Sequence, residues 1–160
     1  MSITRPSGSG LPGQSCSASP SGGVCGLSLL NLPESGRYQV TLTPGGQATM
    51  SFALVFTHAV DDALAIGSPF NLSLPVYGQF AMLSFTASAG QSLTLDVSSV
   101  STNPSQSVWI AVYNASNGTV ASGGTSSSLT FNLPNLAAGT YRLQLSPYYG
   151  GTASATVRVH

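Results

Sequence analysis

The chain contains part of its own sequence twice, and this repeat constrains the fold more than any other feature. Residues 36–44 return in modified form as residues 139–147. Each copy is preceded by an Asn-Leu-Pro, at 31–33 and at 132–134, and is followed by a Gly-Gly pair. Because an internal repeat is one supersecondary unit used more than once, the two regions are expected to share an architecture.

Both copies alternate apolar and polar residues with a period of two, which is the pattern of β-strands with one buried and one solvated face. No segment has sustained helical periodicity, and Gly, Pro and Asn turn signals recur at short intervals. The pattern predicts an all-β fold, an antiparallel β-sandwich of the jelly-roll or immunoglobulin-like kind. Strands are expected over residues 27–31, 36–43, 48–56 and 70–74, and over 79–87, 91–99, 107–114, 118–122, 128–133, 139–146 and 152–159.

The two copies are not equally complete. The second copy is preceded by strands over 79–99 for which the first copy has no counterpart, although residues 1–8 align loosely with 109–114. We therefore expect a partial sandwich repeat with a connector over 1–76 and a complete repeat over 77–160. A sandwich that lacks strands exposes an unpaired strand edge and an open apolar groove.

Composition and charge exclude several classes of function. Only 5% of the residues are charged, there is no lysine, and the net charge is zero. Nucleic acid is not an expected partner, because phosphate binding requires clustered basic residues. No apolar run approaches the roughly 20 residues that span a bilayer. No signal-peptide pattern follows Met1, so a secreted form would take its signal from outside this sequence. A near-neutral surface favours association between copies.

Two cysteines, Cys16 and Cys25, flank a Pro-Ser-Gly-Gly turn signal. The turn can bring the two thiols together, so we predict a disulfide and an oxidising compartment. The alternative is two free thiols in a cytosolic protein. A zinc site is not expected, because neither histidine is near the cysteines.

The run from Cys16 to Pro44, with its Pro-Ser-Gly-Gly-Val-Cys and Gly-Arg-Tyr-Gln-Val-Thr-Leu-Thr-Pro, and the run over 78–97 carry a family resemblance. Together they resemble the β-sandwich repeats of bacterial secreted proteins of the RHS/YD-repeat type, and they are similar to bacterial pre-peptidase C-terminal domains. The resemblance implies an extracellular sandwich module. The YD repeats themselves are absent, so no toxin-encapsulation role is carried over.

Residues with catalytic or metal-binding chemistry are sparse. His58 with Asp61 or Asp62 could form part of a Ser-His-Asp arrangement, but no Gly-x-Ser-x-Gly elbow is present and a polar loop is the simpler interpretation. Asp61 and Asp62 could also bind calcium, although two carboxylates are few for an ion that takes six to eight oxygens. We predict no catalytic residue, no metal site and no cofactor.

Exposed aromatic residues are the remaining candidates. Trp109 lies in a run that is apolar on both faces and is predicted to be in the core of a central strand. Tyr148 and Tyr149 form an aromatic pair inserted in a turn, and they are the candidate contact residues. Covering the end of a sheet is the alternative role for this pair.

The sequence predicts a non-enzymatic extracellular structural module that assembles with itself or with adjacent domains head-to-tail, by strand complementation into a filament. The alternative is a module of a larger secreted bacterial protein that binds carbohydrate or a surface through Tyr148 and Tyr149. A third hypothesis, a hydrolase, depends on His58 alone.

Overall fold

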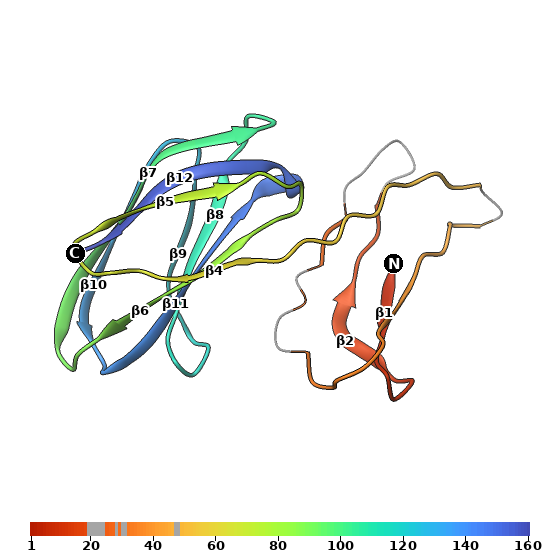
Figure 1. The fold of residues 1–160 in the computed structure, drawn as a ribbon, viewed down its shortest axis with the longest axis horizontal. Coiled ribbons are helices and arrows are strands. Elements are labelled where there is room, and N and C mark those ends of the chain that lie inside the picture. The colour runs from red at the N-terminus through yellow and green to blue at the C-terminus, as the bar shows by residue number, and fades with distance from the viewer. Residues whose placement is uncertain (19–24, 28, 30–31, 47–48) are drawn as a thin grey trace. The chain divides into compact units, whose positions relative to one another are not determined.

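The computed structural model describes residues 1–18, 25–27, 29, 32–46 and 49–160, and it consists of two compact units, Met1–Leu54 and Val55–His160 (Figure 1). The predicted boundary between 76 and 77 falls inside the second unit. The reason is that residues 55–76, expected as a connector and one leading strand, contribute two strands to the sheets of the second unit.

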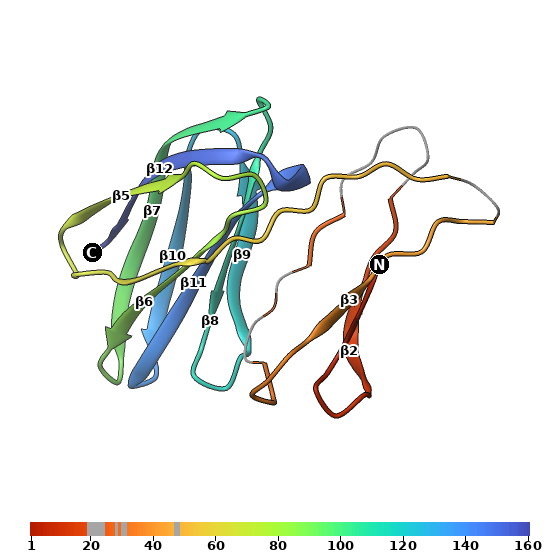
Figure 2. The same cartoon turned by 45° about the vertical axis from the view of Figure 1, so that its right-hand side comes forward.

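The second unit is a β-sandwich, as predicted. Its nine strands are β4 (Val60–Ala63), β5 (Pro69–Leu74), β6 (Ala81–Ala87), β7 (Gln91–Asn103), β8 (Val108–Tyr113), β9 (Thr119–Thr125), β10 (Leu129–Leu136), β11 (Gly139–Pro147) and β12 (Thr152–Val159). One sheet has the order β10-β7-β12-β5 and the other the order β4-β6-β11-β8-β9. Figure 2 shows the strands of this unit from a second angle.

The core of the sandwich follows from the alternation in the sequence. Leu83, Ile110 and Leu143 face inward from the five-stranded sheet. Leu95 and Val157 face inward from the four-stranded sheet, and all five side chains are fully buried. Burial of apolar surface on this scale is the main stabilising contribution to such a unit.

One strand of the second unit was not expected. β4 pairs with β6 in parallel, from Val60 opposite Ala81 to Ala63 opposite Ser84. Asp61 and Asp62 are exposed on this short edge strand, so its sequence has no apolar alternation. The strand forms because its backbone pairs with β6 and because Leu64, immediately after it, is buried in the core.

The first unit holds a three-stranded sheet of order β2-β1-β3, with β1 (Ser2–Thr4), β2 (Gly10–Ser15) and β3 (Gln39–Thr41). Among its described residues only Ile3 is a buried hydrophobic side chain. The strand expected over 36–43 is present but shorter. The strand expected over 48–56 is wrong for residues 49–56, which are not in a strand. The prediction over 27–31 lies partly outside the described residues, and 27 and 29 are not in a strand.

Candidate interaction surfaces

The repeated segments pair with their neighbours in the same register in both units. β3 pairs with β1 antiparallel, with Val40 opposite Ile3. In the second unit β11 pairs with β8 antiparallel, with Leu143 opposite Val112. Leu143 is the residue that aligns with Val40 in the sequence repeat. Within segment 1–8, β1 therefore pairs with β3 as β8 pairs with β11. This correspondence agrees with the loose alignment of residues 1–8 to residues 109–114.

The turn that follows β1 also matches the turn that follows β8. After β1, the Arg5 N–H donates to the Ser9 carbonyl at 2.8 Å and the Gly8 N–H donates to the Arg5 carbonyl at 2.9 Å. After β8, the Asn114 N–H donates to the Gly118 carbonyl at 2.9 Å and the Asn117 N–H donates to the Asn114 carbonyl at 3.0 Å. Gly8 and Asn117 are each the fourth residue after the strand, and both are left-handed, a conformation that glycine and asparagine tolerate best.

Each repeated segment has, as its third residue, a tyrosine whose hydroxyl bonds to the backbone four residues earlier. The Tyr141 hydroxyl donates to the Ala137 carbonyl at 3.1 Å. The Tyr38 hydroxyl donates to the Glu34 carbonyl at 2.8 Å and accepts from the Glu34 N–H at 3.0 Å. This arrangement is a tyrosine corner, a device that fixes the entry of a strand in β-sandwiches. The repeat therefore encodes a strand together with its corner.

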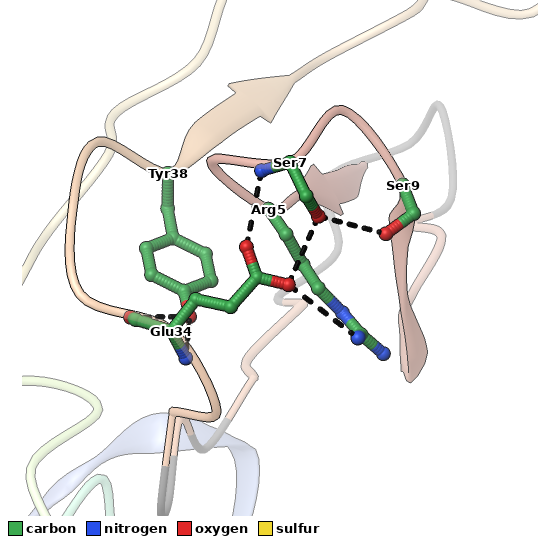
Figure 3. Close-up of polar contacts among 5 residues, drawn as sticks. All are labelled: Arg5, Ser7, Ser9, Glu34 and Tyr38. Carbon is green, nitrogen blue, oxygen red and sulfur yellow. Dashed lines mark hydrogen bonds and ion pairs between the residues drawn. The ribbon is translucent and has the colours of Figure 1, made fainter.

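In the first unit, polar contacts hold the corner to the β1–β2 turn (Figure 3). Glu34 accepts hydrogen bonds from the Ser7 N–H at 3.0 Å and from the Ser7 hydroxyl at 2.9 Å, and it lies 3.7 Å from the Arg5 guanidinium. Gly36, with φ of +136°, lies so close to Pro6 that an added Cβ would come within 3.0 Å of its ring. These contacts fix residues 34–38 against the turn.

β11 and β3 differ at their second edge, the one that does not pair with β8 or β1. β11 has β8 on one side and β6 on the other, with Leu143 opposite Leu83. In the part of the chain that the structure describes, β3 has β1 on one side and no strand on the other. The free edge of β3 therefore corresponds to the edge of β11 that β6 covers.

An apolar row lies downstream of β3. Met50, Phe52 and Leu54 occupy alternate positions and are exposed, with 56% of the surface of Phe52 accessible. By the sequence repeat, Phe52 and Leu54 align with Val157 and Val159 of β12, which are fully buried and lie beside β7. The row thus has the side-chain pattern of an inward sandwich face but is not covered. We call Met50, Phe52 and Leu54 the apolar row.

The predicted disulfide between Cys16 and Cys25 is present, with Cα atoms 5.9 Å apart. It joins the residue after β2 to the segment that leads toward the Asn-Leu-Pro. A bond that closes so short a loop stabilises the folded chain by about 2.5 kcal/mol on the chain-entropy model. A disulfide is consistent with an extracellular or periplasmic location.

Trp109 is not in the core, so that prediction is wrong. Its side chain is 39% exposed, while Val108 and Ile110 on either side of it are fully buried. β8 is flanked by β11 and β9, as expected for a central strand, but its outward face is accessible at Trp109. Apolar character on both faces of a strand therefore predicted its position in the sheet correctly and the burial of its tryptophan incorrectly.

Tyr148 and Tyr149 lie in a short 3₁₀ turn, Tyr148–Gly150, between β11 and β12. Both rings are exposed, Tyr149 to 72%, and their centroids are 6.2 Å apart. The prediction that this pair occupies a turn is therefore confirmed. Its role in contacts remains a prediction.

The remaining polar candidates are dispersed. His58 is exposed, and among the described residues no hydrogen bond joins its imidazole to a carboxylate or a serine hydroxyl. Asp61 and Asp62 are adjacent on β4, and the described ranges contain no group of three His, Cys, Asp or Glu side chains around them that could hold a metal ion.

One ion pair ties the C-terminus to the four-stranded sheet. Asp96 on β7 accepts a hydrogen bond from the Thr130 hydroxyl at 2.6 Å and lies 2.9 Å from His160 Nε2. The hydrogen bonds from Thr130 and His160 hold the pKa of the Asp96 carboxyl below its ordinary value. Both partners are well exposed, so this pair is a minor contribution to stability.

Comparison with known proteins gives a match over part of the second unit. Residues 80–147, which include β6 through β11, match the family model of the bacterial pre-peptidase C-terminal domain. No curated protein matches the chain. The RHS/YD-repeat part of the expected resemblance has no support among these matches.

Two solved structures are similar to this chain. One is the pre-peptidase C-terminal domain of a collagenase from Bacillus anthracis, with 16% identity and a TM-score of 0.48, covering 64% of this chain and 95% of that one. The other is PliG of Aeromonas hydrophila, a periplasmic inhibitor of g-type lysozyme, with 13% identity and a TM-score of 0.44, covering 64% of this chain and 97% of that one.

The described part of the chain includes no helix with the length and hydrophobicity needed to cross a membrane.

Proposed function

We propose that the protein is a non-enzymatic, extracellular structural module that assembles copy to copy by adding strands to its first unit. The observation that carries the proposal is the free edge of β3. β3 has the register and the tyrosine corner of β11, and the turn after its neighbour β1 matches the turn after β8. Among the described residues, however, no strand takes the place beside β3 that β6 takes beside β11. An unpaired strand edge is a template for strand addition.

The apolar row supports the same proposal. In the second unit, the corresponding positions of β12 are buried because β7 and the opposite sheet cover them. In the first unit, Phe52 and its neighbours are exposed, and exposed apolar surface of this kind marks interaction sites. A strand from a second copy that pairs with β3, together with burial of the apolar row, would supply both missing contacts.

A head-to-tail geometry follows from the difference between the units. The acceptor edge lies in the first unit, and the edge strands β4, β5, β9 and β10 of the second unit are the available donors. An acceptor and a donor on different parts of one chain give a heterologous contact, which extends into a filament unless it closes into a ring. The net charge of zero offers little repulsion between copies.

The test is the molar mass of the chain by light scattering over a range of concentrations, followed by negative-stain electron microscopy. We expect the mass to rise with concentration for the native chain, and Phe52→Lys to return it to that of a single chain. Tyr77→Lys, at an exposed residue outside every strand, is the matched control and should leave assembly unchanged. A single-chain mass at every concentration, or equal effects of the two lysines, would contradict the proposal.

A further inference from the structure

A second surface, on the sandwich itself, carries an inference that does not depend on assembly. Trp109 on β8 lies directly opposite Gly124 on β9. Residues that pair directly across two antiparallel strands project from the same face of the sheet. A Cβ placed on Gly124 would lie 3.6 Å from Cε2 and from the hydroxyl oxygen of Tyr148. Trp109 and Tyr148 therefore lie on the same outward face, next to the same side-chain-free position.

Tyr149 extends this aromatic surface and is held there by the backbone. The Tyr148 N–H donates to the Ser107 carbonyl at 3.0 Å, and the Gly78 N–H donates to the Gly150 carbonyl at 2.6 Å, so the turn is anchored on both sides. Tyr149 has φ of +54°, in the left-handed region that costs a bulky side chain about 1–3 kcal/mol. A strained residue that is 72% exposed gains no burial in return, which points to a role outside the fold of the unit.

A polar hollow adjoins the aromatic surface. The residues that line it include Thr102, Gln106, Ser107 and Ser126. The carbonyl of Ser107 accepts the hydrogen bond from the Tyr148 N–H, and Ser126 lies two residues after Gly124, so the hollow is next to the aromatic surface. The loop that forms it is ordered by the Thr102 hydroxyl, which donates to the Gln106 carbonyl and accepts from the Gln106 N–H, both at 2.8 Å.

We propose that Trp109, Tyr148 and Tyr149, with this hollow, form a binding site for a neutral polysaccharide. Exposed aromatic rings offer flat apolar faces to the C–H faces of sugar rings, while hydroxyl and amide groups pair with sugar hydroxyls. None of the residues that line the hollow is charged, so neither an acidic nor a basic polymer gains an ionic contact there.

The experiment measures depletion of the full chain from solution by insoluble cellulose, chitin and mannan, with cross-linked polygalacturonate as the acidic comparison. We expect retention by at least one neutral polymer and none by polygalacturonate. Trp109→Ala and Tyr149→Gly should each weaken that retention roughly tenfold, the loss of about one stacking contact. Trp109→Phe, which keeps a ring, should weaken retention less than Trp109→Ala. Val120→Ala, which removes an exposed side chain elsewhere on β9, is the control that retains binding.

Tyr149→Gly separates binding from folding. Glycine relieves the left-handed strain but gains freedom in the unfolded chain, so the melting temperature should move by no more than about 3 °C. Weaker retention at an unchanged melting temperature supports the proposal. Failure of all three neutral polymers to retain the native chain, or equal retention of native and Tyr149→Gly proteins, would overturn it.

Discussion

The two units of this chain contain the same strand and its corner, in a complete setting and in an incomplete one. β11 lies between β8 and β6 and buries Leu143 and Leu145 in a sandwich core. Among the described residues, β3 has only β1 beside it, and the contacts of Glu34 with Ser7 fix the segment that leads into it. The comparison teaches that a tyrosine corner and a turn specify local geometry on their own, whereas strand length depends on neighbours.

The largest difference should appear at the aligned residues Leu143 and Val40. Leu143→Ala removes a fully buried side chain, and we expect it to destabilise the second unit by about 2–5 kcal/mol. Val40→Ala acts on a half-buried side chain and should cost less than about 1 kcal/mol in the single chain. Chemical denaturation followed by the tryptophan fluorescence of the second unit, and by hydrogen exchange in the first, measures the two costs. Equal costs would mean that the first unit has a core of its own.

The disulfide should matter to one unit only. Cys16→Ser with Cys25→Ser, or reduction of the native chain, should destabilise the first unit by about 2.5 kcal/mol. The cross-link lies wholly within that unit, so the denaturation midpoint of the second unit should not move. Hydrogen exchange of each unit, with and without reductant, checks this result. A shift in the second midpoint would show that the units are coupled.

The two tyrosine corners allow a matched pair of substitutions. Tyr141→Phe removes one hydrogen bond and leaves the ring stacked on Phe85, at 5.4 Å between centroids, so we expect a loss of about 1 kcal/mol. Tyr38→Phe removes two hydrogen bonds to Glu34. It should therefore increase hydrogen exchange at β3 by a larger factor than Tyr141→Phe increases it at β11. If Tyr38→Phe left exchange at β3 unchanged, the corner would not be what holds this strand.

The smallest effect concerns pH. The pKa of Asp96 is lowered in the folded chain by its hydrogen bonds from Thr130 and His160. Its contribution to stability is therefore complete above the ordinary carboxyl pKa, and it is lost as the pH falls through the lower folded value. Because the pair is exposed, the loss should be less than about 1 kcal/mol. Asp96→Asn should remove this part of the pH dependence from the denaturation curves of the second unit. If the stability of the Asp96→Asn variant kept the same pH dependence, that dependence would come from other carboxylates.

The sequence predicted the second unit well because its strands have partners within the chain. Seven strands expected from alternation over 79–159 are all present, with ends that differ by a few residues at most. The turn at Tyr148 and the disulfide were also predicted, since each depends on nearby residues.

The errors have a common cause in contacts that alternation does not encode. β4 was missed because its pairing with β6 is a backbone property and its side chains are polar. Residues 49–56 have the alternation of a strand but no described neighbour with which to pair. The prediction that Trp109 lies in the core is wrong because the apolar sequence of β8 does not reveal that the outer face of this strand is accessible. The aromatic surface around it could be recognised only when β9 placed Gly124 beside Trp109 and Tyr148.

The central claim is that the free edge of β3 accepts a strand from another copy. Hydrogen exchange at the amides of residues 39–41, measured at increasing protein concentration, tests it most directly, with the amides of residues 142–144 in β11 as the internal reference. The account predicts that exchange at β3 slows as concentration rises, while exchange at β11 stays constant because both of its edges are already paired. Exchange at β3 that is independent of concentration would contradict it.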